Sequence, residues 1–383
     1  MNIYNNLERV FMTTIYNFNE IDNLDVLIAN NLYQDLFILA SNYEEYLILK
    51  EKNFLVKEKK KNYYLCLKKG KNPFIFSNNH KRYHTLDYHL KEKYQYKVAK
   101  IPINAGFTCP NIDGSKSFGG CTFCSVKGSG DFAGLPTEDL LIQWENGKKM
   151  MQKKWPNAKF IAYFQAFSNT YAPLDILKEK FEPFASFKEC IGIDIATRPD
   201  CLDDDIIEYL ADLNKRCNLI VELGLQTIHE KTATIINRQH DLDTFDWAVN
   251  ALRKHNINVV VHIINGLPKE TKEMMIETAK YVGNLDIQGL KIHLLHVTSD
   301  SKLVNQLNNN FLTLLSKEEY IEIVSEQLAL INPKIVIHRL TGDAPTDTFI
   351  GPLWSRKKGQ VLNDIDKYLI KHNLYQGKNF KKP

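Results

Sequence analysis

Three cysteines carry the most specific chemistry in this chain. Cys109, Cys121 and Cys124 lie in one glycine-rich stretch, with eleven residues between the first and second and two between the second and third. A Cys-x-x-Cys pair joined through a loop to one more thiolate can hold an iron-sulfur cube by three of its irons. The iron left open can bind the amino and carboxylate groups of S-adenosylmethionine and pass an electron to its sulfonium. The spacing therefore predicts a 4Fe-4S cluster that releases a 5′-deoxyadenosyl radical.

Two other uses of cysteine fit this spacing less well. A structural zinc ion normally takes four ligands, and the loop holds no fourth one, so His80, His84 or His89 would have to reach in from further away. A thioredoxin-like redox pair opens a helix and needs no third cysteine. We interpret the other cysteines as small buried hydrophobic residues. They are Cys66, Cys190, Cys201 and Cys217.

Length and composition indicate a soluble globular protein. The 383 residues suffice for one barrel-sized domain and an appendage, and 44% of them are hydrophobic and 25% charged. The chain has no run of about 18 uncharged apolar residues, and its first residues lack the pattern of a signal peptide. Scattered cysteines and an iron-sulfur motif fit a reducing compartment. We therefore expect a cytoplasmic protein with no membrane partner.

The net charge of +4 does not by itself indicate a nucleic-acid partner, but the positive residues are unevenly placed. Basic and aromatic side chains alternate in residues 50–71, 354–358 and 375–383, a pattern that can hold phosphates and stack on bases. Solvated faces of a lysine-rich chain give the same pattern, so the partner stays open. The candidate contacts are Lys59, Lys60, Lys61, Lys68, Lys69, Arg356, Lys357 and Lys358.

From residue 97 onward the chain repeats an apolar strand followed by an amphipathic helix. This alternation indicates parallel βαβ units whose strands are buried on both faces. Six units make an α/β fold, an incomplete (β/α)6 barrel of parallel strands, to which residues 335–340 can add a strand. We expect strands near 97–105, 160–167, 191–197, 219–226, 258–265 and 290–297, and helices near 138–154, 174–186, 203–216, 241–255, 270–283 and 316–331.

The carboxyl ends of the strands are where a barrel of this kind places its site. The cysteine loop follows the first strand, and the other informative residues also fall near strand ends. They are Gln165, Arg198, Glu222, Gln226, Gly266 and His296.

Residues 1–80 depart from the barrel pattern. Apolar residues fall on one face of two helical stretches, near 22–40 and 42–50, so we expect a mostly helical N-terminal extension. Residues 70–81 have the punctuation of a linker. We therefore divide the chain into an extension of unknown role (1–80), a core (81–332) and a C-terminal segment (333–383) that packs on the barrel and ends in a basic tail.

Ordered blocks of sequence carry a family resemblance from about residue 81 to about residue 376. The chain resembles the YtqA/YhcC family of radical S-adenosylmethionine (radical SAM) proteins, a branch related to the catalytic subunit of Elongator. At two positions, Gln239 and Lys269, the chain departs from a pattern that has glycine. The matching blocks are 82–86, 104–111, 113–115, 120–124, 163–173, 196–202, 221–226, 262–268, 291–296 and 338–343.

The resemblance implies a role for each matching residue. Cys109, Cys121 and Cys124 would bind the 4Fe-4S cluster, and the other residues would bind S-adenosylmethionine. Phe123 would lie near the adenine, Gln165 to Asn169 near the methionine amino group, and Arg198 would pair with the methionine carboxylate, a task suited to its planar fork. Glu222 and Gln226 would reach the ribose hydroxyls, and Gly266 would let the backbone approach the adenine.

The resemblance also implies a reaction, although less specifically. Relatives are associated with the wobble uridine side chain of transfer RNA, so we expect a radical SAM enzyme that makes or converts a 5-aminomethyl-type group there. It would need a reducing electron donor such as flavodoxin or ferredoxin. A radical SAM enzyme with a small-molecule substrate is the first alternative, and a non-enzymatic, metal-stabilised RNA-binding protein is the second.

Overall fold

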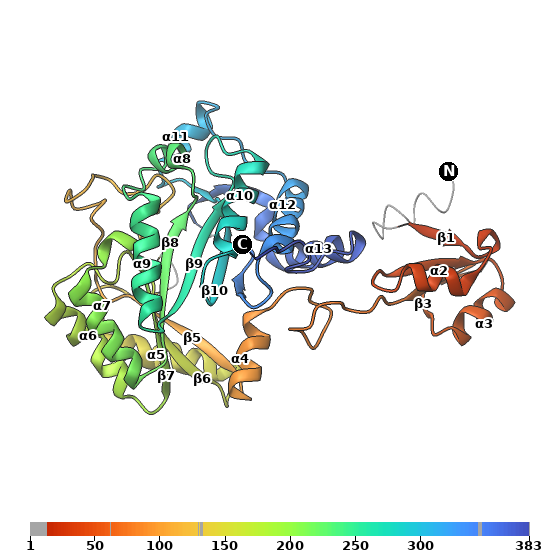
Figure 1. The fold of residues 1–383 in the computed structure, drawn as a ribbon, viewed down its shortest axis with the longest axis horizontal. Helices are drawn as coiled ribbons and strands as arrows, with labels where there is room; N and C mark the ends of the chain where they lie inside the picture. Colours follow the sequence, from red (N-terminus) through yellow and green to blue (C-terminus); the bar gives the residue numbers. More distant parts are fainter. Residues whose placement is uncertain (1–13, 62, 129, 131–132, 344–346, 383) are drawn as a thin grey trace.

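A computed structural model describes residues 14–61, 63–128, 130, 133–343 and 347–382 (Figure 1). The first thirteen residues of the expected extension and the last residue of the basic tail lie outside the described residues.

A curled sheet of seven parallel strands forms the centre of the molecule (Figure 1). Its strand order is β12-β10-β9-β8-β7-β6-β5, so neighbouring strands follow one another along the chain. The one strand skipped, β11, pairs with β13 in a separate antiparallel sheet. The sheet is open between β12 and β5, so it is an incomplete barrel, and the predicted seventh strand is present. The strands are β5 (Val98–Ile103), β6 (Lys159–Phe164), β7 (Cys190–Thr197), β8 (Leu219–Gln226), β9 (Asn258–Asn265), β10 (Gly289–Leu294) and β12 (Val336–Arg339).

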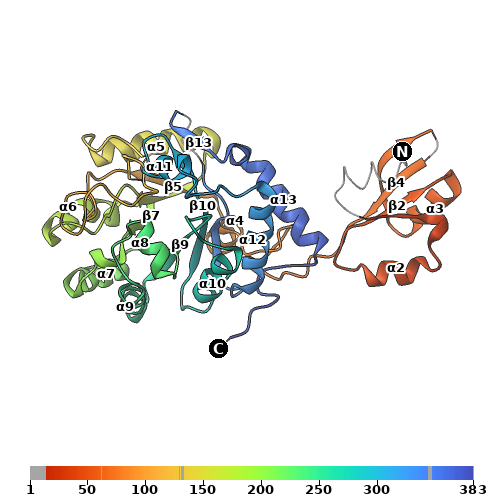
Figure 2. The ribbon, with the colours of Figure 1, turned by 90° about the horizontal axis from the view of Figure 1, so that it is seen from above.

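Helices cover the outside of this sheet (Figure 2). Each of the six expected helices is present within two residues of its predicted bounds, because each has a polar N-cap or a proline before an amphipathic run. In α7, the Asp203 carboxylate accepts a hydrogen bond from the Ile206 backbone, and Ile206, Leu210 and Leu213 are buried against the sheet. The six are α5 (Leu140–Lys154), α6 (Leu174–Ser186), α7 (Asp204–Arg216), α9 (Leu242–Lys254), α10 (Lys272–Gly283) and α12 (Lys317–Leu330).

Side chains alternate between the two faces of each strand. In β7, Ile193 and Ile195 belong to the main hydrophobic core, between the sheet and the helices. Asp194 lies between them and bonds to Lys100 from β5, inside the barrel. The barrel interior is therefore partly polar, while its outer layer is apolar.

The N-terminal extension is not mostly helical, and this expectation was wrong. The helix expected over 22–40 ends at Asn30, and Leu36–Ala40 forms the buried strand β2. Residues such as Phe37 and Ile38 face opposite sides of a sheet, so a continuous apolar run that looked helical is a strand with both faces covered. The unit is a four-stranded sheet, β1-β2-β4-β3, with two helices. Its elements are β1 (Ile15–Asn17), η1 (Phe18–Glu20), α2 (Leu24–Asn30), β2 (Leu36–Ala40), α3 (Tyr43–Glu51), β3 (Leu55–Lys60) and β4 (Tyr63–Lys68).

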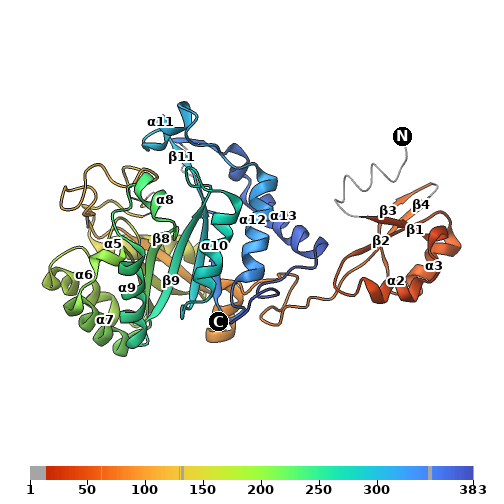
Figure 3. The same cartoon turned by 45° about the horizontal axis from the view of Figure 1, so that its top comes forward.

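This N-terminal unit lies beside α13 (Lys358–Lys371), away from the loops at the carboxyl ends of the barrel strands (Figure 3). Contact between them includes a hydrogen bond of 2.9 Å from Gln34 Nε2 to the Lys371 carbonyl. Arg82, in the linker, donates to the Tyr33 carbonyl. The unit is thus tied to the outer layer of the barrel and not to its mouth.

Short elements complete the described chain. The helix α13 packs on α12, and β11 pairs with β13 above the end of β10. Within the described ranges, no helix is both long and apolar enough to span a membrane. The remaining elements are α4 (Leu86–Tyr94), η2 (Pro199–Cys201), α8 (Glu230–Ile235), β11 (Val297–Thr298), α11 (Leu303–Asn308), β13 (Phe349–Gly351) and η3 (Leu353–Arg356).

Candidate active site

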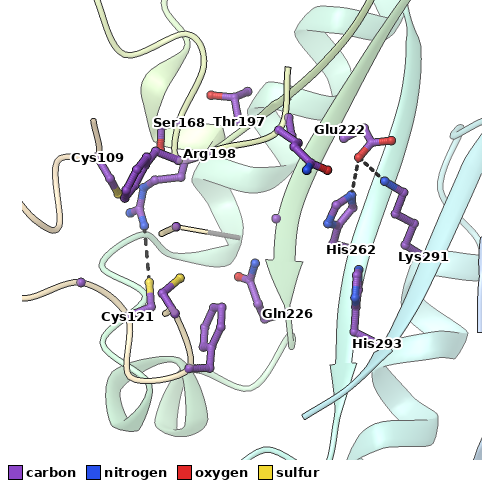
Figure 4. A pocket seen from close by; sticks show the side chains of 18 of the residues that line it. Cys109, Cys121, Ser168, Thr197, Arg198, Glu222, Gln226, His262, Lys291 and His293 are labelled. Carbon is purple, nitrogen blue, oxygen red and sulfur yellow. Dashed lines mark hydrogen bonds and ion pairs between the residues drawn. The ribbon is translucent and has the colours of Figure 1, made fainter. Parts of the chain in front are cut away.

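A cavity of about 200 Å³ lies inside the barrel, toward the carboxyl ends of the strands (Figure 4). It has two chemically different ends. Three cysteines and Arg198 line one end, which we call the cysteine end. We call the other end the inner end, and we include in it Lys100 and Asp194, which bond to each other and through Lys100 to Glu222. The side chains that line it carry charged, imidazole or phenol groups. These are Tyr163, Glu222, His262, Lys291, His293 and Arg339.

The loop that carries the cysteines is folded by its own polar residues and glycines. Asn111 donates to the Cys121 sulfur at 3.4 Å and to the Asn237 carbonyl at 2.7 Å, which ties the loop to the segment after α8. Gly119 and Gly120 take φ values of 75° and 74°, a left-handed conformation that costs glycine little. The long gap between the first two cysteines therefore turns back and brings Cys121 to the same cavity as Cys109.

The thiols of the Cys-x-x-Cys pair share one hydrogen bond. The bond from the Cys124 thiol lowers the pKa of Cys121 to about 7, and the Arg198 charge and Asn111 also favour its thiolate. The same bond raises the pKa of Cys124 well above its usual range. Because metals bind the thiolate, Cys121 is the thiol best prepared for ligation.

Cys109, Cys121 and Cys124 are the cysteines that line the cavity. Across the described segments, no three His, Cys, Asp or Glu side chains are gathered around one point as for a single metal ion. The three thiols instead face a shared space, a donor set that suits a 4Fe-4S cluster with one iron open. Cys66, Cys190, Cys201 and Cys217 lie elsewhere, and all are buried or half-buried as predicted.

Arg198 lies beside the cysteines but is already paired. Its Nε and Nη2 atoms each lie 2.9 Å from an oxygen of Asp200, and Nη2 also donates to the Arg238 carbonyl at 2.7 Å. Its Nη1 atom points to the Cys121 sulfur at 3.8 Å (Figure 4). The bidentate face that we expected to hold the methionine carboxylate thus holds Asp200, and the remaining edge faces the cysteine end.

The other predicted cofactor residues divide into two groups. Phe123, Gln165 and Gln226 line the cavity, and Gln226 takes a φ of 64° where β8 ends. Asn169 and Gly266 are not among the lining residues. Asn169 is fully buried and donates to the Ala166 and Ala196 carbonyls.

Gly266 ends β9 with a φ of 89°, and its backbone N–H points to the Met275 sulfur at 3.2 Å. The backbone conformation explains why the family pattern has glycine at the two positions where this chain does not. Gln239 and Lys269 take φ values of 62° and 65°, so both occupy a conformation that glycine adopts more easily.

Glu222 is not at a strand end, so this part of our expectation was wrong. It is the fourth of eight residues of β8 and is 1% exposed. Its Oε2 atom accepts from Tyr163 at 2.8 Å, from His262 at 2.9 Å and from Lys291, and its Oε1 atom lies 3.0 Å from Lys100. Glu222 is therefore the centre of the inner end. Both of its carboxylate oxygens already accept hydrogen bonds from the protein, which differs from the expected contact with the ribose hydroxyls.

The sequence analysis missed most of the inner end. Lys100, Asp194, His262 and Lys291 interrupt strands that we read as continuously apolar, each in a different strand. One charged or imidazole side chain per strand, all facing inward, was the signal that could have found them. Nothing local in the sequence shows that they meet, because the register between strands decides it.

Burial and charge together shift the pKa values at the inner end. Burial raises the pKa of Glu222, but the charges of Lys100 and Lys291 outweigh it and hold this pKa well below its usual range. Burial lowers the pKa of Lys291 to about 8, against the charge of Glu222 and helped by those of Lys100 and Arg339. Burial also lowers the pKa values of His262 and His293. The inner end therefore holds neutral imidazoles around a fixed ion-pair network.

Comparison with known proteins identifies the class to which this fold and these thiols belong. The Radical SAM superfamily matches residues 117–282, and the Radical_SAM C-terminal domain matches residues 287–371. The archaeal Elp3 of Methanocaldococcus infernus, solved with an N-terminal deletion, has the same fold, with a TM-score of 0.58. That alignment covers 73% of this chain and 64% of the archaeal chain at 18% identity.

Similarity to curated proteins narrows the class to a family. YtqA of Bacillus subtilis (strain 168) is 53% identical over 311 residues, which is 81% of this chain and 97% of YtqA. YhcC of Escherichia coli (strain K12) is 30% identical over 77% of this chain and 94% of YhcC. Elongator complex protein 3 of Mus musculus is 28% identical over 42% of this chain and 29% of its own length.

The chain belongs to the YtqA/YhcC family of radical SAM proteins, as the sequence predicted. It is a radical SAM superfamily enzyme with a 4Fe-4S cluster and S-adenosylmethionine as cofactors. When bound, these cofactors supply a 5′-deoxyadenosyl radical. The chain's own residues supply the thiols, hold Arg198 in position and line the cavity from its cysteine end to its inner end.

Proposed function

We propose that this radical SAM enzyme modifies the wobble uridine side chain of transfer RNA, where it makes or converts a 5-aminomethyl-type group. The observation that carries the proposal is the similarity to Elongator complex protein 3 over 164 residues, within a family resemblance that implies this substrate. A radical that abstracts hydrogen suits an unactivated carbon of such a side chain, which acid-base chemistry does not reach.

Within this proposal, each part of the cavity has a task. Cys109, Cys121 and Cys124 hold the cluster, and Phe123, Gln165 and Gln226 contact S-adenosylmethionine. Arg198 holds the Cys121 side of the cluster through Nη1 while Asp200 fixes its orientation. Asn169 and Gly266 act indirectly by shaping the strand ends, and Glu222 organises the inner end.

A substrate as large as transfer RNA would also meet the outer surface of the protein. Lys59 and Lys60 are exposed on β3 of the N-terminal unit, where Lys59 lies 5.2 Å from the ring centre of Tyr64. These lysines lie away from the loops at the carboxyl ends of the barrel strands, because the N-terminal unit lies beside α13 (Figure 3). Lys69 is paired with Asp35. The proposed phosphate contacts on this unit are therefore a second contact, remote from the cavity.

Analysis of transfer RNA from a deletion strain tests the proposal most directly. We expect the nucleoside profile to lose one wobble uridine derivative and accumulate its precursor, and the intact gene to restore it. Cys121→Ala should not restore the profile, whereas the matched control Cys217→Ala should, because Cys217 lies at the end of α7 outside the cavity. An unchanged profile in the deletion strain would exclude a transfer RNA substrate, and the small-molecule alternative would replace it.

Binding experiments test the proposed second contact. Each phosphate contact that is removed should lower the slope of log affinity against log salt by about 0.9 for duplex and about 0.7 for single-stranded regions. Neutralising Lys59 and Lys60 should therefore weaken transfer RNA binding and flatten this slope by about 1.4 to 1.8. Unchanged binding in this variant would remove the N-terminal unit from the proposal.

We also propose a cytoplasmic location and a flavodoxin-type or ferredoxin-type electron donor. Reduction assays with either protein would test the electron donor.

A further inference from the structure

Arg339 is a cation that the described cavity leaves without a partner. It is the last residue of β12, is half-buried and lines the inner end. Among the described residues its side chain has no hydrogen bond and no ion pair. A guanidinium has five N–H donors, and it is uncommon in a folded protein for none of them to contact an acceptor from the protein.

The neighbouring charges make this arrangement more costly. Lys291 lies directly opposite Arg339 in the paired strands β10 and β12, and like charges in this position repel. Glu222 and Asp194 are the carboxylates of the network, and they bind Lys291 and Lys100. The two lysines are therefore balanced by two carboxylates, and Arg339 is left as excess positive charge at the inner end.

Two imidazoles next to Arg339 also lack partners. The Nε2 atoms of His293 and His296 are buried and have no hydrogen-bond partner in the described structure. A side-chain carbon on Gly342 would lie 3.8 Å from His296 Cε1, 3.9 Å from Arg339 Nη1 and 4.0 Å from His293 Nδ1. His293 in β10, His296 just after β10 and Arg339 in β12 thus meet around Gly342, which has no side chain to fill the space between them.

We propose that Arg339 and His293 form a binding subsite for an anionic group of the substrate, a carboxylate or a phosphate, at the inner end of the cavity. The planar fork of Arg339 donates two parallel hydrogen bonds to two oxygens of the anion. The neutral imidazole of His293, which lines the same cavity, donates a third. The anion offsets the excess positive charge beside Lys291.

Such a subsite would fix the position of the substrate between two ends of one cavity. The cofactors bound at the cysteine end would supply the radical. An anionic group held by Arg339 would place a neighbouring carbon of the substrate between the cysteine end and the inner end. This subsite rests on the proposed function only for the identity of the molecule that carries the anion. If the substrate is not transfer RNA, the anion subsite still stands.

Thermal unfolding with simple anions tests the subsite without any substrate. The cluster-containing wild type, Arg339→Gln and Lys302→Gln are compared in potassium acetate, potassium phosphate and potassium chloride at equal ionic strength. Lys302 is a matched control because it is a cation that donates to the Phe118 carbonyl in the cysteine loop and does not line the cavity. We expect acetate, phosphate or both to raise the midpoint of the wild type and of Lys302→Gln above that in chloride.

Arg339→Gln should lose most of this rise. Acetate alone would identify the ligand as a carboxylate, and phosphate alone would identify it as a phosphate. Equal midpoints in all three salts for the wild type, or an equal rise in Arg339→Gln, would overturn the subsite. If saturating S-adenosylmethionine abolishes the rise, the anion is the methionine carboxylate of the cofactor, and the assignment to the substrate is wrong.

Kinetics with transfer RNA from the deletion strain then separate the two proposals. If transfer RNA is the substrate, Arg339→Gln should raise its KM at least tenfold, and Arg339→Lys should recover part of this loss because it keeps the charge but not the fork. A KM within twofold of wild type would overturn the assignment of the anion to transfer RNA. If transfer RNA is not turned over at all but the salt effect depends on Arg339, the proposed function falls and the anion subsite stands.

Discussion

The two ends of the cavity are built in different ways. The cysteine end comes from one loop of sixteen residues, Cys109 to Cys124, with Arg198 from the end of β7. The inner end draws on all seven strands of the sheet, from Lys100 on β5 to Arg339 on β12, so its residues come from separate parts of the chain.

The comparison shows what each construction provides. The cysteine end is held by glycines in left-handed conformations and by hydrogen bonds from the loop, so its three thiols come to line one cavity. The inner end is held by buried ion pairs, and removing one partner of such a pair leaves an uncompensated charge inside the barrel. Changes at the first end should therefore affect cofactor chemistry, and changes at the second should affect folding as well.

The largest effect is expected from the three cysteines. Replacing Cys109, Cys121 or Cys124 by alanine should abolish the cluster and all release of 5′-deoxyadenosine, because each thiolate binds one iron. Iron and sulfide content after anaerobic reconstitution measures this loss. Cys190→Ala and Cys217→Ala are controls outside the cavity and should keep the cluster. Stoichiometric zinc without iron in the wild type would contradict the cluster.

Glu222→Gln should have the largest effect on stability. It leaves Lys100 and Lys291 in the barrel with only Asp194 to balance them, and removing one partner of a buried ion pair costs about 3 to 5 kcal/mol. Urea denaturation measures the free energy of unfolding. Glu145→Gln breaks a partly exposed pair with Lys148, which keeps Glu189 as a partner, and should cost about 1 kcal/mol or less. Equal losses in the two variants would show that the inner network is not a structural element.

His240 should make stability depend on pH at the boundary between the two ends. Burial and the charges of Arg238 and Arg198 lower its pKa from 6.5 to about 4, against the charge of Asp200. The folded-state pKa lies below the unfolded value, so the unfolded chain binds more protons between about pH 6.5 and pH 4. Stability should therefore fall as the pH falls through this window, by up to about 3 kcal/mol from this residue.

Denaturation curves at several pH values test this expectation. In His240→Gln, the fall in stability between pH 6.5 and pH 4 should be smaller than in the wild type. His255→Gln removes an exposed histidine after α9 and is the matched control. Parallel pH profiles for His240→Gln and the wild type would show that His240 does not cause the acid sensitivity.

Arg198→Lys should have the smallest of these effects and should separate positioning from cluster binding. Lysine keeps the charge near Asp200 but cannot contact Asp200, the Arg238 carbonyl and the Cys121 sulfur together. We expect iron content to stay at the wild-type level and dithionite-driven release of 5′-deoxyadenosine to fall about tenfold, equivalent to about 1.4 kcal/mol. Lys116→Ala, which also removes a partner of Asp200, is the control. A wild-type rate in Arg198→Lys would show that the fork is not needed.

Local sequence patterns determined the barrel and the cysteine end. Apolar strands of six to eight residues and amphipathic helices with polar caps read correctly because their signals lie within one element. The helix expected over 22–40 was wrong because Leu36–Ala40 is apolar on both faces, and only its pairing with β1 and β4 makes it a strand. Hydrophobic periodicity alone cannot separate a short buried strand from a buried helix.

The tertiary structure decided what the remaining polar residues do. The sequence by itself determined the family, the three thiols and the order of the strands, because these depend on contiguous residues. It did not determine that Glu222 binds two lysines, or that the Arg339 side chain faces Lys291 with no hydrogen-bond partner among the described residues. Those contacts join residues far apart in the chain, and the register of parallel strands alone brings them together.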